Sequence, residues 1–343
     1  MLQIDPLKRP PNAELELAGS KSITNRALLI AALAEGKSTL SRALFAEDTL
    51  AMINCLQAFG IDIKHDHTTA TIAINGSGGE LETPQKELWV RQSGTTARFI
   101  LPLSALVKAP IEVDGDNQIR SRPQHDLLLA LNELGVEIAH NGEMGHLPLT
   151  IDGSNLTVTD ISVSGETSSQ YLSALLLVGP CLPEKITLTL DENAVSTPYI
   201  QMTIEIMKAF GAQVDSSKPN SYTVHPTGYV GRDYEIETDA STASYFFAAA
   251  AASKGRVVVN GIGSNSIQGD LEFVEILQQM GAQTLIRPNS VEVTGPTRLD
   301  GIDVSMKNIS DTAPTLASIA PFASSPVRVT DIGFIQHKES DRV

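Results

Sequence analysis

The stretch LAGSKSITNRALL, residues 17–29, contains the pattern from which the rest of the chain is built. Three hydroxyl side chains and an amide lead into an apolar run, and the cations Lys21 and Arg26 lie among them. Hydroxyl side chains are typical of a helix N-terminus, where they accept hydrogen bonds from free backbone N–H groups. Cations are unfavourable there because the helix dipole is positive at that end. A bound anion would remove this conflict, so the stretch predicts an anion-binding helix start.

The same pattern recurs four times further along the chain. The copies read VRQSGTTARFILPLSAL (90–106), GETSSQYLSALL (165–176), ETDASTASYFFAAA (237–250) and NISDTAPTLASIA (308–320). Equivalent positions in successive copies are 72, 72, 74 and 70 residues apart. Regular spacing of this kind indicates an internal repeat.

Glycines between an expected helix and an expected strand keep the same period. They are Gly60, Gly135, Gly211 and Gly281, at intervals of 75, 76 and 70 residues. Glycine is favoured after a helix because it readily adopts positive φ. Each unit of 70–76 residues therefore contains a loop, a helix, a strand, a second helix, a glycine turn and two strands, which predicts an α/β fold. The next glycine of the series would fall beyond Val343, so we expect a fifth unit that is cut in half.

The composition predicts a globular protein of about two domains, with 343 residues, 42% hydrophobic and 19% charged. No apolar stretch reaches the roughly 18 residues that a membrane-spanning helix needs, and the first residues lack the apolar core of a signal peptide. We therefore expect a cytoplasmic protein. The net charge of −15 argues against a nucleic-acid surface, whereas a small anionic ligand requires only a local group of cations.

The sequence gives little support for a metal or a cofactor. Cys55 and Cys181 lack the spacing of a metal site, and His65 and His67 lie in a polar turn. The glycine-rich turns do not follow a strand and open a helix, and neither a phosphate-binding P-loop nor a GxSxG motif is present. We expect no metal and no cofactor.

Two further charged clusters fit the anion-binding interpretation. DGDNQIRSRPQHD (114–126) contains Arg120 and Arg122, and QHKESDR (336–342) contains Lys338, Glu339 and Arg342. Isolated clusters of charge are usually solvated surface, but these recur with the repeat. Asp311 lies in the helix-start loop of the fifth copy, where both helix capping and a functional role stay open.

Eight ordered motifs resemble the 5-enolpyruvylshikimate-3-phosphate synthase (EPSP synthase) family. They are GSKSITNRALL, SGTTARF, RSRP, SSQYLSALL, STPYIQMT, DASTASYFFAAAA, NSIQGD and KESDR. The resemblance covers essentially the whole chain and implies a two-domain inverse α/β barrel built from βαβαββ-type units. It also implies one domain formed by residues 1–18 and 238–343, the latter part incomplete, and a second domain formed by residues 19–237.

The resemblance implies transfer of the enolpyruvyl group of phosphoenolpyruvate to the 5-hydroxyl of shikimate 3-phosphate. The residues implied to bind shikimate 3-phosphate are Ser22, Arg26, Ser168, Ser169, Gln170, Ser196, Tyr199 and Lys338. Those implied to surround phosphoenolpyruvate are Lys21, Gly94, Arg122 and Arg342, with Gln170 shared. Asp311 is the implied general base, Glu339 the implied group that moves a proton at the methylene carbon, and Lys21 a participant in that proton transfer.

Two alternatives stay open at this point. The UDP-N-acetylglucosamine enolpyruvyl transferases typically carry a Cys in the loop before their Arg-Pro, and DGDNQIRSRP has none. A chain that ends at Val343 could also bind shikimate 3-phosphate without turnover. The resemblance further implies a monomer and a target of the family's inhibitor glyphosate.

Overall fold

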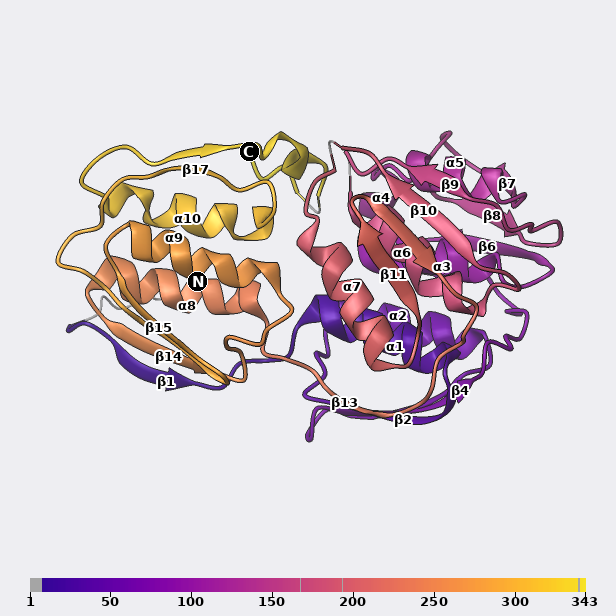
Figure 1. Cartoon of the computed structure of the whole chain (residues 1–343), viewed down its shortest axis with the longest axis horizontal. Coiled ribbons are helices and arrows are strands. Elements are labelled where there is room, and N and C mark those ends of the chain that lie inside the picture. The colour runs from indigo at the N-terminus through magenta and orange to yellow at the C-terminus, as the bar shows by residue number, and fades with distance from the viewer. Residues whose placement is uncertain (1–7, 167, 193, 339) are drawn as a thin grey trace. The chain divides into compact units, whose positions relative to one another are not determined.

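The computed structural model describes residues 8–166, 168–192, 194–338 and 340–343 (Figure 1). The chain divides into two compact units. Unit 1 contains the residues up to Ala18 together with Glu237–Ile335 and Arg342–Val343, and unit 2 contains Gly19–Ile236 and Gln336–Asp341.

Unit 2 contains three four-stranded sheets with one common topology. Their strand orders are β13(Asp233–Glu235)-β2(Glu35–Ser41)-β4(Thr71–Ser77)-β3(Asp62–Asp66), β5(Leu88–Trp89)-β6(Pro110–Asp114)-β8(Leu149–Asp152)-β7(Glu137–His140) and β9(Ile161–Val163)-β10(Ile186–Leu190)-β12(Ser221–Val224)-β11(Val214–Lys218). In each sheet the first two strands are parallel and the other neighbouring strands are antiparallel. The repeat read from the sequence is therefore a repeat of sheet topology.

Unit 1 contains a fourth sheet of the same kind. Its order is β1(Asn12–Leu15)-β14(Arg256–Asn260)-β16(Ser290–Thr294)-β15(Gln283–Arg287), again with only the first pair parallel. The strands β17(Asp303–Ser305) and β18(Arg328–Thr330) form a parallel pair that matches the start of another such sheet.

Two of the four sheets take their first strand from a distant part of the chain. Asn12 of β1 pairs with Arg256 of β14, and Asp233 of β13 pairs with Thr39 of β2. The two chain segments that pass from one unit to the other thus each lie next to a strand that completes a sheet.

The helices occupy the faces of these sheets. They are α1(Lys21–Leu33), α2(Glu47–Ala58), α3(Gly94–Ser104), α4(Asn117–Arg120), α5(His125–Glu133), α6(Gln170–Val178), α7(Pro198–Ala209), α8(Ala240–Ser253), α9(Phe273–Gln279) and α10(Ala313–Ile319). Short 3-10 turns follow or precede several of them: η1(Gly179–Cys181), η2(Gly269–Glu272), η3(Ser310–Thr312), η4(Ala320–Phe322) and η5(Gly333–His337).

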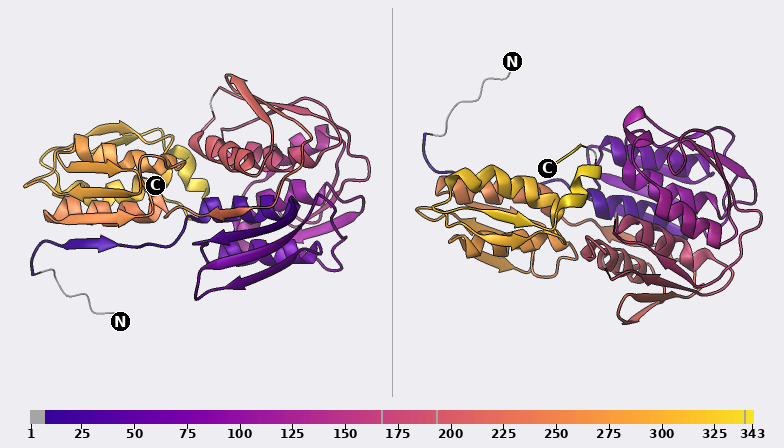
Figure 2. Two further views of the ribbon diagram at one scale, coloured as in Figure 1. Left: turned by 60° about the horizontal axis from the view of Figure 1, so that its bottom comes forward. Right: turned by 90° about the horizontal axis from the view of Figure 1, so that it is seen from above.

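In unit 2 the helices α1, α3 and α6 pack against one another inside the sheets (Figure 2). Every residue of α1 from Ile23 to Leu33 is buried, and so is every residue of α6 after Gln170. Helices inside and sheets outside are the arrangement of an inverse α/β barrel, so the predicted fold class is confirmed.

In unit 1 the helices α8 and α9 lie over one face of the sheet that contains β14, and α10 packs beside α8 (Figure 1). The apolar side chains between these layers, among them Phe247, Phe273 and Leu316, form one buried cluster.

The helix starts and the glycine turns of the repeat lie at the residues predicted from the sequence. The first helices of the successive units begin at residues 21, 94, 170, 240 and 313, with spacings inside the predicted 70–76 residues. The four predicted glycines each follow a helix and have φ between 78° and 97°, a region that costs residues with a Cβ about 1 kcal/mol or more. Among the described residues, no helix is both long and apolar enough to cross a membrane.

Candidate active site

Most predicted site residues of unit 2 lie at or near helix starts, whereas Arg122 lies between α4 and α5 and Lys338 follows η5. Ser20 and Ser93 are the N-cap residues of α1 and α3, and each side chain accepts a hydrogen bond from a backbone N–H three residues later. Asp239 caps α8 in the same way. For the loop before α8, the capping interpretation is therefore sufficient.

Arg26 is a buried cation on α1, 1% exposed. Its Nε donates to Thr203 Oγ1 at 2.7 Å, its Nη1 to the Ser22 carbonyl at 3.0 Å and its Nη2 to the Tyr199 carbonyl at 3.4 Å. Its Cζ lies 5.3 Å and 5.9 Å from the ring centres of Phe99 and Tyr199. Burial lowers the pKa of Arg26 to about 10, so the side chain is still charged at neutral pH.

The charge of Arg26 has no carboxylate partner among the described residues, because its three hydrogen-bond acceptors are all neutral. A buried charge with only neutral partners is unfavourable unless an opposite charge approaches it. Arg26 is therefore a candidate residue for binding an anion.

Gly94 and Arg122 lie in direct contact. Gly94 is the first residue of α3, and a Cβ built on it would lie only 2.4 Å from Nη1 of Arg122. Arg122 is 6% exposed. The missing side chain of Gly94 thus gives the guanidinium access to the start of α3.

Ser168 and Gln170 are held by a residue outside the predicted set. Nη1 of Arg98, on α3, donates to Gln170 Oε1 at 2.7 Å and to Ser168 Oγ at 3.3 Å. The other end of the Gln170 amide donates from Nε2 to Thr95 Oγ1 at 3.2 Å. Ser169 is buried at the N-cap position of α6. These contacts join the starts of α3 and α6.

Ser196 and Tyr199 lie at the start of α7. Ser196 is buried and has a φ of 55°, a left-handed conformation that is uncommon for serine and found preferentially at functional sites. Its carbonyl accepts from the Tyr199 backbone N–H at 3.1 Å, and the Tyr199 ring lies beside Arg26. The starts of α1 and α7 are therefore connected through Arg26.

Lys21, the first residue of α1, pairs with an acidic residue of α2. Its Nζ lies 3.0 Å from Asp48 Oδ2. Asp48 is in the first turn of α2, where the helix dipole favours a carboxylate, and its carbonyl accepts from Thr96 Oγ1 at 3.0 Å. Asp48 thus supplies the negative charge that a cation at the start of α1 requires.

Asp311 and Arg342 lie together in unit 1. Asp311 is in the 3-10 turn η3, and its Oδ1 accepts from Arg342 Nη1 at 2.9 Å. Both side chains are partly exposed. Lys338 is half-buried and belongs to unit 2. Glu339, predicted to take part in proton transfer, lies outside the described residues.

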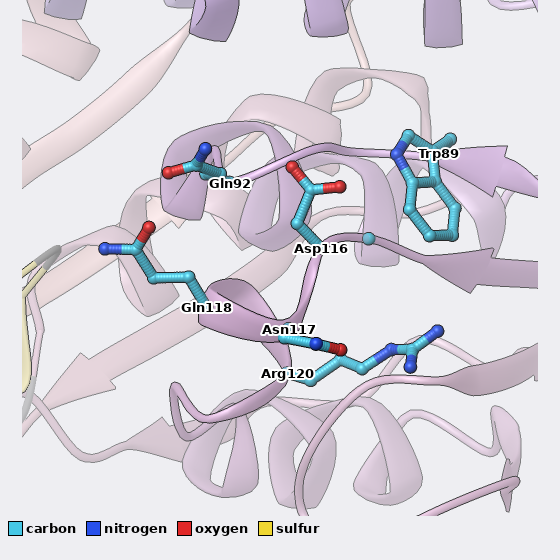
Figure 3. Close-up of a pocket in the computed structure, with 7 residues that line it drawn as sticks. Trp89, Gln92, Asp116, Asn117, Gln118 and Arg120 are labelled. Carbon is cyan, nitrogen blue, oxygen red and sulfur yellow. The ribbon is translucent and has the colours of Figure 1, made fainter.

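A cavity of about 510 Å³ opens beside the start of α4 (Figure 3). Its lining is Trp89, Gln92, Gly115, Asp116, Asn117, Gln118 and Arg120, and of these only Arg120 belongs to a cluster singled out in the sequence. Across the part of the chain that the structure describes, no group of three or more His, Cys, Asp or Glu residues is placed to hold a metal ion.

Arg98, Thr203 and Asp48 are among the contact residues that were absent from the predicted site. Arg98 lies in the motif SGTTARF, but no role was assigned to it from the sequence. Thr203, inside α7, and Asp48, inside α2, had no sequence signal, because each acts on a residue in another helix.

Solved structures with the same fold are enolpyruvyl transferases. The EPSP synthase of Acinetobacter baumannii superimposes with a TM-score of 0.83 at 26% identity, covering 98% of this chain and 77% of that chain. An enolpyruvyl transferase from Streptomyces tendae gives a TM-score of 0.73 at 15% identity, covering 94% and 75%, and supports the fold alone. The fold defines an enolpyruvyl-transferase-type protein.

Sequence comparisons narrow this class. The family described as EPSP synthase (3-phosphoshikimate 1-carboxyvinyltransferase) matches residues 8–343. The 3-phosphoshikimate 1-carboxyvinyltransferase of Trichormus variabilis is 42% identical over 343 residues, covering 100% of this chain and 80% of the relative. That of Methanothermobacter thermautotrophicus is 36% identical over 324 residues, covering 94% and 76%. The chain belongs to the EPSP synthase family, which confirms the predicted family and the transferase class.

Proposed function

We propose that this chain transfers the enolpyruvyl group of phosphoenolpyruvate to the 5-hydroxyl of shikimate 3-phosphate and releases phosphate. Membership of the EPSP synthase family supports this reaction. Within the structure the proposal is carried by Arg26, a buried guanidinium whose acceptors among the described residues are all neutral. Both substrates are phosphorylated carboxylates, which guanidinium groups bind through paired hydrogen bonds.

The shikimate 3-phosphate site in this proposal is built on the helix starts of unit 2. Its residues are Ser22, Arg26, Ser168, Ser169, Gln170, Ser196 and Tyr199, with Lys338. The contacts of Arg26 with Tyr199 join α1 to α7, and those of Arg98 with Gln170 join α3 to α6. A common site is supported because Arg26 also lies against the Phe99 ring of α3.

Phosphoenolpyruvate in this proposal is surrounded by Lys21, Gly94, Arg122 and Arg342, with Gln170 shared between the substrates. The contact between Gly94 and Arg122 supports this part, because it brings a buried guanidinium to a helix start. Exposed N–H groups at that helix start add to the binding of an anion.

Proton transfer in this proposal uses two carboxylates. Asp311 takes the proton of the 5-hydroxyl as the oxygen forms its bond to the enolpyruvyl carbon. Glu339 moves a proton to or from the methylene carbon of the enolpyruvyl group, and Lys21 shares in that transfer. Phosphate leaves with the electrons of the broken C–O bond, so no oxidant or reductant is required.

The remaining parts of the proposal concern the whole chain. We propose a cytoplasmic monomer that binds no nucleic acid, in line with its net charge of −15. We further propose that residues 1–18 with 238–343 form one domain and residues 19–237 the other.

The proposed function is tested by phosphate release from phosphoenolpyruvate, with and without shikimate 3-phosphate, together with calorimetric titration of shikimate 3-phosphate alone. Release that depends on shikimate 3-phosphate is the expected result. Release that depends on UDP-N-acetylglucosamine instead would assign the other enolpyruvyl transfer. Binding of shikimate 3-phosphate without release would indicate the binding-only alternative. The absence of both binding and phosphate release would overturn the proposal.

A further inference from the structure

Thr203 makes the one side-chain hydrogen bond that Arg26 has among the described residues. The two residues are 177 positions apart, on α7 and α1, and Arg26 Nε lies 2.7 Å from Thr203 Oγ1. Thr203 is completely buried and Arg26 is 1% exposed. A hydrogen bond from a charged donor in such a buried place is strong and sets the geometry of both groups.

Thr203 is itself held in place by two further contacts. Its Oγ1 lies 2.7 Å from the Tyr199 carbonyl and 3.1 Å from Ser173 Oγ, and it donates its hydrogen to these acceptors. A hydroxyl has one hydrogen and two lone pairs. Because the hydrogen is used toward Tyr199 and Ser173, the oxygen presents a lone pair to Arg26.

The remaining contacts of Arg26 decide which N–H groups are left for a ligand. A guanidinium has five N–H donors in a rigid plane. Nε–H goes to Thr203, and one N–H of each Nη goes to the carbonyls of Ser22 and Tyr199. Two N–H groups are left, one on each Nη, and these two can clamp an anion with two parallel hydrogen bonds.

We infer that Thr203 is a positioning residue of the shikimate 3-phosphate site, which fixes the plane of the Arg26 guanidinium so that its two remaining N–H groups face the substrate anion. The inference rests on the proposed function. The Ser22 and Tyr199 carbonyls accept from the two Nη atoms, and Thr203 supplies the third contact of the guanidinium plane and its shortest, at Nε.

The test compares Thr203→Val, which keeps the shape and removes the acceptor, with Thr203→Ser, which keeps the hydroxyl. Thr187→Val is the matched control, since Thr187 lies on β10 and its hydroxyl contacts only Thr223 among the described residues. The full chain is titrated with shikimate 3-phosphate by calorimetry, and each variant is also combined with Arg26→Lys. Thermal unfolding of each variant checks that it is folded.

We expect Thr203→Val to weaken binding about tenfold, because a misplaced guanidinium loses one of its paired hydrogen bonds. Thr203→Ser is expected to bind within about threefold of the unchanged chain, and Thr187→Val within about twofold. In the Arg26→Lys background, Thr203→Val should weaken binding by less than about twofold, because the planar group that it orients is gone.

Equal weakening in both backgrounds would mean that Thr203 acts only on stability and would overturn the inference. So would unchanged binding by Thr203→Val in a chain that binds shikimate 3-phosphate normally. Failure of the unchanged chain to bind shikimate 3-phosphate would instead overturn the proposed function and this inference with it.

Discussion

Arg98 and Gln170 are 72 residues apart, one repeat length, and are joined by a hydrogen bond of 2.7 Å from Nη1 to Oε1. The bond fixes the orientation of the Gln170 amide, because the oxygen faces Arg98 and Nε2 therefore faces Thr95 at the start of α3. Ionised carboxylate and phosphate groups accept hydrogen bonds and do not donate them. Arg98 thus turns the donor end of the amide toward the place where an anion is proposed to bind.

Replacing Arg98 should disturb this orientation. In Arg98→Met the amide of Gln170 can rotate, and we expect binding of shikimate 3-phosphate to weaken about tenfold. Calorimetric titration measures the effect. Arg287→Met is a suitable control, since Arg287 pairs with Glu292 on the surface of unit 1. Unchanged binding by Arg98→Met would show that Gln170 needs no partner to be oriented.

A methyl group at Gly94 should act on one substrate only. The Cβ of Gly94→Ala would lie 2.4 Å from Arg122 Nη1 and 2.6 Å from its Cζ, so the guanidinium has to move. We expect the KM for phosphoenolpyruvate to rise about tenfold while the Kd for shikimate 3-phosphate changes less than about threefold. Steady-state kinetics and calorimetry measure the two quantities. Equal effects on both substrates would contradict the separation of the two sites.

Arg26 should reduce the stability of the chain while it provides binding. Its pKa, lowered by burial to about 10 from an ordinary value of 12.5, means that folding disfavours the charged form. This penalty is fully present below about pH 10 and decreases as the pH rises toward the unfolded value. At neutral pH the penalty is therefore at its maximum.

We accordingly expect Arg26→Met to have a free energy of unfolding at pH 7 equal to or above that of the unchanged chain. The Kd for shikimate 3-phosphate should rise by a factor of about 100 or more, since the charge-assisted hydrogen bonds are removed. In the unchanged chain, substrate at 100 times its Kd should add about 2.7 kcal/mol to the free energy of unfolding. Urea unfolding with and without substrate tests both statements, and a strongly destabilised Arg26→Met would contradict them.

The local signals of the sequence were enough to predict the helix starts and the glycine turns. Ser20, Ser93 and Asp239 act as N-caps, and the glycine after each second helix has positive φ. Each of these features depends on residues within one turn of each other. These N-cap residues and glycines can therefore be recognised in each copy of the repeat, and their period predicts the α/β architecture.

Contacts between distant segments had no such signal. Nothing in residues 12–15 indicates that they pair with β14, because a short strand pattern carries no register toward a partner 244 positions away. Thr203 and Asp48 likewise look like ordinary helix residues. Their roles depend on which helices pack together, and only the three-dimensional structure provides that information.

The pairing of Lys21 with Asp48 predicts a further effect on turnover. The ion pair with Asp48 restrains the long, flexible side chain of Lys21 at the start of α1. In Asp48→Asn the restraint is weaker, so we expect kcat to fall about tenfold. Glu47→Gln is the matched control from the same turn of α2, since Glu47 is mostly exposed and 3.8 Å from its partner Arg91. A larger loss with Glu47→Gln than with Asp48→Asn would contradict this role.

The contact between Asp311 and Arg342 allows the proposed general base to be tested directly. Asp311→Asn keeps the shape and an oxygen that can accept from Arg342 Nη1, but it cannot take a proton from the 5-hydroxyl. We expect turnover to fall about 10²- to 10⁴-fold, with binding of shikimate 3-phosphate within about threefold. Asp303→Asn controls for the loss of a carboxylate in unit 1, since Asp303 pairs with Arg328 on the surface. If Asp311→Asn retained more than a tenth of the phosphate release, the proton would have to leave by another group, and Asp311 would serve only to hold Arg342.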